Sequence, residues 1–188
     1  MLYYTSMNYE LEAKYLGINK EELRSKLSSA GAECVSKERL MQRVVFENDC
    51  LNNKRAWLRV RNEGEIVTMT LKQALDAQDI YKTKELEIIV SDFTSTVTIL
   101  NMLGLEQKRY QENYRESWKL GNVSIEIDSW PLIPPYIEIE ADSEEEVRGA
   151  SKKLGFDYND AVFGSADEVF KKYYNIDILI LDKLVFDK

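Results

Sequence analysis

Hydrophobic and polar residues alternate along several stretches of the chain, and three of these stretches carry a Glu-x-Glu pair. Side chains two residues apart in a strand share a face, so each pair places both carboxylates together. Each run is followed by apolar residues at helical spacing and then by glycine. The three pairs are Glu10/Glu12, Glu85/Glu87 and Glu138/Glu140. The pattern predicts a strand–helix unit that occurs three times.

Capping residues mark where the expected helices begin. Ser143 and Ser165 are each followed three residues later by Glu, which is the spacing of a capping box. We expect four helices, which begin after Asn19, Asp92, Ser143 and Ser165. The first three end at a glycine, the residue favoured just past a helix.

The remaining alternating runs predict further strands. With the three Glu-x-Glu runs, they cover residues 9–15, 40–47, 57–62, 66–72, 84–90, 107–120, 123–130 and 136–140. Residues 48–54 and 74–79 have the polar composition of loops. The expected fold is therefore a single α+β domain dominated by an antiparallel sheet of about eight strands.

Composition narrows the class of protein. The chain has 188 residues, of which 44% are hydrophobic and 31% charged, as in a soluble globular domain. We expect no membrane association, because no apolar run approaches the ~20 residues that span a bilayer. The N-terminal residues lack the pattern of a signal peptide, and two cysteines do not make a disulfide framework. A cytoplasmic location is therefore expected.

The chain contains no histidine. This excludes histidine acid–base catalysis, Ser-His-Asp triads and nearly all catalytic zinc sites. Any catalysis must then depend on carboxylates, on Lys or Arg, on Tyr or on a hard metal ion. The net charge of −8 argues against general nucleic-acid binding, which needs a basic surface.

Acidic and basic side chains are segregated onto different strands. Glu126 and Asp128 share a face, as the three Glu-x-Glu pairs do, whereas Arg59 and Arg61 share a face on another strand. A polar face in water is the usual outcome for any single strand. If the sheet curls with these faces inward, it forms a closed barrel with a charged interior and helices packed outside.

Such an interior suits a polyphosphate bound together with a metal ion. Arginine forks bind phosphate oxygens in bidentate fashion. Mg²⁺ takes a few carboxylate oxygens and keeps water and phosphate ligands. Opposed acidic and basic walls therefore indicate a site for a metal-bound polyphosphate.

The motifs Glu10-x-Glu12-x-Lys14 and Arg59-x-Arg61 make the chain recognisable. In order with Lys72, Arg115 and the late acidic strands, they resemble the CYTH superfamily of triphosphate tunnel metalloenzymes. These include class IV adenylate cyclases, thiamine triphosphatases and inorganic triphosphatases. The resemblance covers roughly residues 8–176, so we expect a CYTH domain over residues 1–176. Residues 177–188 would be an extension that packs on the domain or on a partner.

The resemblance implies roles for individual residues. The first-strand metal ligands are Glu10 and Glu12, and the late acidic strands supply Asp128, Glu138 and Glu140. The residues implied in triphosphate binding and catalysis are Lys14, Arg59, Arg61, Lys72 and Arg115. The role of Glu85 and Glu87 varies in the family, and these two stay candidates together with Arg43 and Glu126.

One position departs from the family pattern. Asn113 occupies the place where a lysine commonly lies two residues before the arginine of this strand. Arg109 shares the same strand face by parity and is a candidate to supply the missing charge. Altered substrate binding is one expectation, and a non-catalytic polyphosphate- or nucleotide-binding module is another.

The leading hypothesis is a phosphohydrolase, dependent on Mg²⁺ or Mn²⁺, that acts on inorganic triphosphate, thiamine triphosphate or a nucleoside triphosphate. A class IV-type adenylate cyclase, which converts ATP to cyclic AMP and pyrophosphate, is the alternative. The expected partner is the small-molecule substrate, with neither nucleic acid nor membrane. The sequence does not determine the oligomeric state, and a homodimer remains open.

Overall fold

The computed structural model describes residues 8–9, 11–74 and 83–187. The strands are β1 (Asn8–Tyr9), β2 (Leu11–Leu16), β3 (Glu33–Glu47), β4 (Ala56–Asn62), β5 (Val67–Ala74), β6 (Thr83–Val90), β7 (Glu106–Leu120), β8 (Val123–Ser129), β9 (Tyr136–Ala141) and β10 (Lys183–Leu184). The helices are α1 (Lys20–Ser29), α2 (Asp49–Asn52), α3 (Phe93–Met102), α4 (Glu144–Lys153) and α5 (Ala166–Tyr174), with 3-10 turns η1 (Tyr158–Asp160) and η2 (Ile178–Ile180).

The strands form one sheet in the order β1-β6-β5-β4-β3-β7-β8-β9-β2. All neighbours along this path are antiparallel, and β10 is added parallel to β7. The expected α+β class with an antiparallel sheet is confirmed. The closed barrel is not confirmed, because the hydrogen-bonded path has two ends, β1 and β2. These ends are separated in sequence by one residue, Glu10, which lies outside the described residues.

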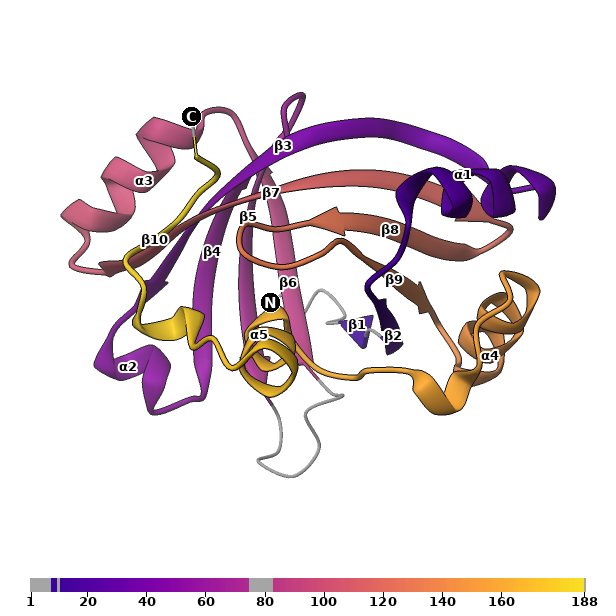
Figure 1. The fold of residues 1–188 in the computed structure, drawn as a ribbon. Helices are drawn as coiled ribbons and strands as arrows, with labels where there is room; N and C mark the ends of the chain where they lie inside the picture. The colour runs from indigo at the N-terminus through magenta and orange to yellow at the C-terminus, as the bar shows by residue number, and fades with distance from the viewer. Residues whose placement is uncertain (1–7, 10, 75–82, 188) are drawn as a thin grey trace.

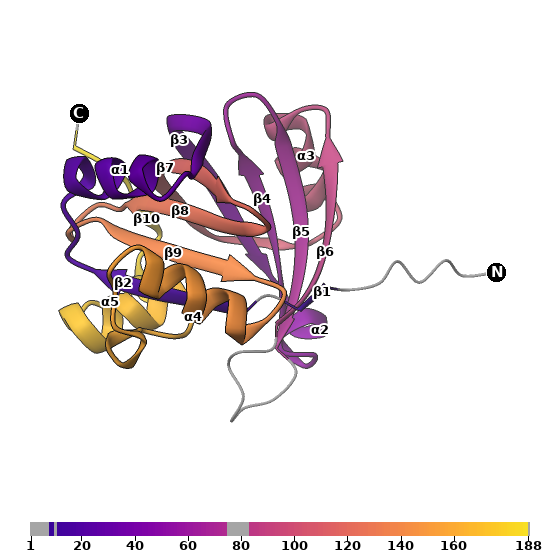
Figure 2. The same ribbon diagram turned by 90° about the vertical axis from the view of Figure 1, so that its right-hand side faces the viewer.

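The sheet is strongly curved, as the two views of the ribbon show (Figures 1 and 2). Strands β4, β5 and β6 form one wall, and β7, β8 and β9 form the other (Figure 2). Strands β3 and β7 join the walls through a long antiparallel pairing that runs from Glu33↔Lys119 to Glu47↔Glu106. The curvature leaves the sheet with an outer face and an enclosed inner face.

Helices cover the outer face with apolar side chains. Leu27 of α1 and Leu154, the residue that follows α4, pack against Ile125 and Ile139 of β8 and β9. Helix α3 contributes Leu100 to a second cluster on β3 and β4. A third cluster joins α5 to the residues between β8 and β9. The outward positions thus form the core, and the inward positions are free for polar residues.

The predicted helix starts are confirmed. Asn19 accepts hydrogen bonds from the backbone N–H groups of Glu21 and Glu22, Asp92 caps α3, and Ser143 caps α4. Ser165 and Glu168 form the expected capping box of α5. These local hydrogen bonds satisfy N–H groups that have no partner within the helix.

Two segments differ from the sequence expectation. β3 begins at Glu33 instead of residue 40, because pairing with β7 compensates for its exposed polar first half. Residues 48–54, expected as a loop, contain the short helix α2, whose cap Asn48 accepts from the N–H of Leu51 at 2.9 Å.

The C-terminal extension packs on the domain. Leu184 and Ile178 are buried with the α5 cluster, and Phe186 lies against Tyr114 with ring centroids 4.9 Å apart. Strand β10 pairs with the half of β7 that extends beyond β8. Among the described residues, no helix has the length and apolar character needed to cross a membrane.

Candidate functional site

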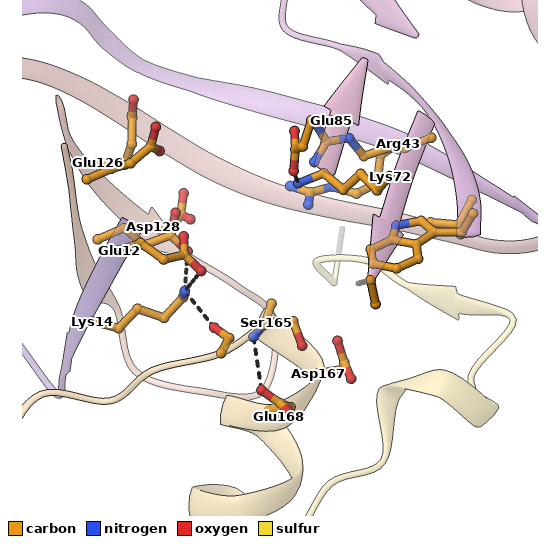
Figure 3. Close-up of a pocket in the computed structure, with 18 of the residues that line it drawn as sticks. Glu12, Lys14, Arg43, Lys72, Glu85, Glu126, Asp128, Ser165, Asp167 and Glu168 are labelled. Carbon is orange, nitrogen blue, oxygen red and sulfur yellow. Dashed lines mark hydrogen bonds and ion pairs between the residues drawn. The ribbon is translucent and has the colours of Figure 1, made fainter. Parts of the chain in front are cut away.

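The inner face of the sheet encloses one large cavity of about 1590 Å³. Figure 3 shows Glu12, Glu126 and Asp128 on one side of it, and Arg43 and Lys72 on the other. Every candidate residue from the sequence that the structure describes lines this cavity: Glu12, Lys14, Arg43, Arg59, Arg61, Lys72, Glu85, Glu87, Arg109, Arg115, Glu126, Asp128, Glu138 and Glu140. Glu10 lies outside the described residues. The alternation of side chains along the strands therefore identified residues that line the same cavity.

Lys14 is the most enclosed cation of the cavity, with 1% of its surface exposed. Its Nζ lies 2.5 Å from Oε1 of Glu12 and 3.6 Å from Oε1 of Glu138, and it donates to the carbonyl oxygen of Gly164 at 2.7 Å. Burial lowers the pKa of Lys14, but the carboxylates of Glu138 and Glu12 outweigh this effect and raise it. The side chain is therefore a fixed positive charge within the acidic wall.

Arg115 joins two carboxylates of neighbouring strands. Its Nε and Nη2 donate to Asp128 at 2.8 Å and 2.5 Å, and Nη2 also lies 2.8 Å from Oε2 of Glu138. Burial lowers the pKa of Arg115, but Asp128 and Glu138 raise it well above its usual range. Burial raises the pKa of Glu138, but Lys14 and Arg115 lower it to about 2. Arg115 of β7 is therefore held by carboxylates of both β8 and β9.

The paired arginines of β4 are held by acidic and hydroxyl neighbours. Arg59 donates to Oγ1 of Thr70 at 3.2 Å and lies 3.6 Å from Glu87. Arg61 contacts Oε1 of Glu63 at 2.6 Å through Nη2. Burial and the neighbouring Arg61 lower the pKa of Arg59 to about 10. The guanidinium groups thus face the cavity from fixed positions.

Two further cations that line the cavity form ion pairs. Lys72 of β5 pairs with Glu85 of β6, and Arg109 of β7 pairs with Glu47 at the end of β3. Arg109 also donates to the carbonyl oxygen of Leu179 at 3.4 Å. The contacts of Arg109 therefore connect it to the C-terminal extension, and none of them reaches Asn113.

Arg43 makes a different set of contacts. Its Nη2 donates to Oδ1 of Asn113, and its guanidinium lies over the ring of Trp130, 4.5 Å from the centroid. Burial, together with Arg59 and Arg61, lowers the pKa of Arg43 to about 9. Arg43 is thus a buried cation among other cations.

The acidic wall contains carboxylates that repel each other. Glu12 and Glu140 are direct partners across β2 and β9. Burial, followed by the charges of Glu12 and Glu138, raises the pKa of Glu140 to about 7. Burial also raises the pKa of Glu126. A nearby cation would relieve this repulsion.

The donor set on this wall fits a hard divalent cation, because it offers carboxylate oxygens and neither imidazole nor thiolate. Within residues 8–9, 11–74 and 83–187, no three acidic or cysteine side chains come together closely enough to hold a metal ion. Lys14 and Arg115 occupy oxygens of Glu12, Asp128 and Glu138. These carboxylate oxygens are therefore engaged by cations of the protein itself.

Sequence reasoning missed three residues of the site region. Trp130 and Tyr136 line the cavity, and Glu63 holds Arg61 and lies 3.6 Å from Arg39. All three continue the period of two beyond a recognised motif. Trp130 lies two residues after Asp128, Tyr136 lies two residues before Glu138, and Glu63 lies two residues after Arg61. Applying the parity to the terminal residues of the expected strands 123–130 and 136–140, and one residue past the end of strand 57–62, would have found them.

Solved structures with similar folds come from several organisms. A conserved hypothetical protein from Pyrococcus furiosus is 24% identical, with a TM-score of 0.67 over 81% of this chain and 94% of that chain. A candidate adenylate cyclase from Vibrio parahaemolyticus is 15% identical, with a TM-score of 0.75 over 88% of this chain and 99% of that chain. At these identities the likeness establishes the fold alone.

A Hippeastrum protein, described as a candidate adenylyl cyclase with a dominant triphosphatase activity, is 16% identical to this chain. It has a TM-score of 0.58 over 89% of this chain and 96% of that chain. No curated protein matches the sequence. The sequence profile of the CYTH domain matches residues 8–169, which is most of the chain. The cavity of charged strands and this match together show that the chain belongs to the CYTH domain family.

Proposed function

We propose that the protein is a metal-dependent phosphohydrolase that binds a triphosphate in the charged cavity. The observation that carries this proposal is the crowding of buried cations on the basic wall. Arg43 and Arg59 have pKa values lowered to about 9 and about 10 by burial and by neighbouring arginines. A bound polyanion would compensate the repulsion between these arginines, so the wall favours a ligand with several negative charges.

The basic side chains have complementary tasks in this proposal. Arg59, Arg61 and Arg115 present guanidinium forks to phosphate oxygens, and Lys14 and Lys72 present point charges. Phosphoryl transfer needs little covalent participation by the protein, so fixed cations supply most of the catalysis. They orient the phosphate chain and stabilise the charge that develops on the leaving phosphate oxygens. Arg109 would contact the outer end of the chain.

A divalent cation would be held on the acidic wall by Glu12, Glu138 and Glu140, with Glu10 and Asp128 as further ligands. When bound, Mg²⁺ or Mn²⁺ supplies Lewis acidity toward the phosphates and lowers the pKa of the attacking water. The raised pKa of Glu140, caused by burial and by Glu12 and Glu138, supports a cation beside this residue.

We extend the proposal to the shape of the site. β1 pairs with β6, and β2 pairs with β9, while only Glu10 separates β1 from β2. A continuous first strand would join the two ends of the sheet into a closed barrel. The cavity would then be a tunnel with the triphosphate along its axis.

The test is to incubate the protein with tripolyphosphate, thiamine triphosphate and ATP, each with Mg²⁺ and with Mn²⁺. Orthophosphate, pyrophosphate and cyclic AMP are then measured. We expect release of orthophosphate from at least one substrate and loss of release when EDTA removes the metal. Cyclic AMP as the main product from ATP would instead establish the cyclase alternative. Binding of all three compounds without any product would establish a non-catalytic module.

A further inference from the structure

Arg43 is the cation of the cavity wall for which sequence motifs offered least support. It lies on β3 and shares its inward face with Val45, which also lines the cavity. Its residue surface is 9% exposed. No ion pair joins it to a carboxylate within residues 8–9, 11–74 and 83–187, although most cations around it have such a partner. A buried cation without a counter-charge is costly unless a ligand supplies one.

Several donors around Arg43 also lack acceptors. The Nε atoms of Arg43 and Arg59, the Nε1 of Trp130 and the hydroxyl of Tyr136 are all buried without a hydrogen-bond partner among the described residues. All four side chains line the same cavity. Buried polar groups in proteins are normally satisfied. A concentration of unpaired donors therefore points to an acceptor-rich ligand.

Asn113 explains why Arg43 can occupy this position. Its Oδ1 accepts from Nη2 of Arg43, and its Nδ2 donates to Oδ1 of Asp128 at 3.0 Å. Only a side chain that both accepts and donates can join a guanidinium to a carboxylate. A lysine at position 113 has no acceptor, and it would place a second positive charge next to Arg43. Asparagine here is thus matched to arginine at position 43.

We infer that Arg43 binds a phosphate group of the substrate and that Asn113 positions its guanidinium. Arg43 lies on β3, the strand adjacent to β7, opposite Gln111 and next to Asn113 on the same inward face. Trp130 supports the guanidinium plane from one side. This inference rests on the proposed function, because it names a contact for the triphosphate.

The first measurement is the affinity of the protein for tripolyphosphate and for ATP by calorimetry, in Mg²⁺. Arg43→Gln removes the charge and should weaken both ligands at least about tenfold, as expected for the loss of a charge-assisted contact. Lys119→Gln removes one charge from the exposed part of β7, outside the cavity, and should leave both affinities unchanged. Equal affinity of Arg43→Gln and the unaltered protein would overturn the inference. Loss of ATP binding alone would also overturn it, because Arg43 would then contact the nucleoside.

The second measurement transfers the positive charge from position 43 to position 113. Asn113→Lys alone should weaken tripolyphosphate binding. The introduced ammonium group and the guanidinium of Arg43 would then lie in the same part of the cavity and repel each other. Combined with Arg43→Gln, it should return the affinity to within about threefold of the unaltered protein, a coupling typical of residues in direct contact. A double variant that binds no better than Arg43→Gln would show that the two positions do not share this role.

The unfolding temperature distinguishes a role of Arg43 in ligand binding from a role in the stability of the fold. Without ligand, Arg43→Gln should unfold at the same temperature as the unaltered protein or higher, since it removes repulsion with Arg59 and Arg61. A lower unfolding temperature with unchanged tripolyphosphate affinity would assign Arg43 to structure and refute the inference. Arg43→Lys, which keeps the charge but not the planar fork, should bind with intermediate affinity even if the glutamine variant fails to fold. If the unaltered protein binds no triphosphate at all, the proposed function itself fails.

Discussion

At the scale of single residues, Lys14 shows how the fold stabilises a buried charge. The ammonium group contacts carboxylates on two strands and the carbonyl oxygen of Gly164, a residue 150 positions away in the sequence. The contacts with Glu12 and Gly164 are hydrogen bonds, and the contact with Glu138, at 3.6 Å, is an ion pair. The side chain thus holds β2, β9 and the segment before α5 in a fixed arrangement.

Replacing Lys14 by Met tests this arrangement. We expect triphosphate turnover to fall about 10²-fold or more, because a fixed charge near the developing negative charge is lost. Stability should fall as well, since Glu12 and Glu138 lose their common cation. Steady-state kinetics and urea unfolding measure the two effects. Lys20→Met, which removes a partly exposed lysine paired with Glu38, is the matched control. Turnover equal to that of the unaltered protein would contradict the prediction.

At the scale of elements, the start of α5 depends on one glycine. Gly164 has a φ of +104°, and a Cβ at this position would lie 1.7 Å from Oε2 of Glu168. The same carboxylate accepts from the N–H of Ser165 at 3.2 Å in the capping box. Any larger residue must therefore strain the backbone and displace the cap together.

Gly164→Ala should lower the free energy of unfolding by about 1–3 kcal/mol, the usual cost of a strained backbone position. Gly149→Ala in the exposed middle of α4 is the matched control, because nothing lies within 4 Å of its added Cβ. That substitution should stabilise the protein by about 0.5–1 kcal/mol. Thermal and urea unfolding of both variants check the opposite signs. A Gly164 variant as stable as the unaltered protein would show that the turn can adopt another conformation.

A second element contact fastens α1 to β7. Arg24 contacts Glu116 through Nε at 3.0 Å and Nη2 at 2.6 Å, and Trp118 donates to the same carboxylate at 2.8 Å. Burial raises the pKa of Glu116, but the hydrogen bonds from Arg24 and Trp118 outweigh it and lower the pKa below 4.5. The folded protein therefore binds fewer protons at this group than the unfolded chain does.

The stabilisation from Glu116 is present above pH 4.5, its ordinary pKa, and is lost as the pH falls through the lowered value. Glu116→Gln should cost about 1–3 kcal/mol near neutral pH, and the difference should shrink in strong acid. Urea unfolding of both proteins across this pH range measures the effect. Glu33→Gln, an exposed position on β3, should show no such pH-dependent difference. A constant difference at all pH values would exclude the ionised contact as its cause.

At the scale of the whole molecule, the sequence predicted the sheet and the inward residues better than the connections. Alternation is a local property, so it identified Arg59, Lys72 and Glu138 on the inner face without knowledge of the tertiary structure. The first half of β3 is exposed and polar, and only its pairing with β7 makes it a strand. The contact of Arg43 with Asn113 likewise depends on strand register, which a single sequence leaves undetermined. The roles of the site residues remain predictions.

The C-terminal extension provides a prediction at this scale. Deleting residues 177–188 should lower the free energy of unfolding by about 3–6 kcal/mol, because two fully buried side chains, Ile178 and Leu184, are lost. Urea unfolding measures the difference. Val185→Ala, at a position 40% exposed, should have little effect and serves as the control. Unchanged stability of the shortened chain would show that the extension is dispensable for the fold.

The placement of β1 and β2 at opposite ends of the strand order has a consequence for the way the chain folds. β1 and β2 precede β6 and β9, the strands with which they pair, and Lys14 completes its contacts only when Gly164 is present. Contacts of such large sequence separation form slowly, because the intervening chain must first be ordered. β2 is therefore synthesised before β9 but can dock only after β9 is present. Until then the acidic residues of β9 lack their partner strand, so the charged interior assembles only when nearly the whole domain has been synthesised.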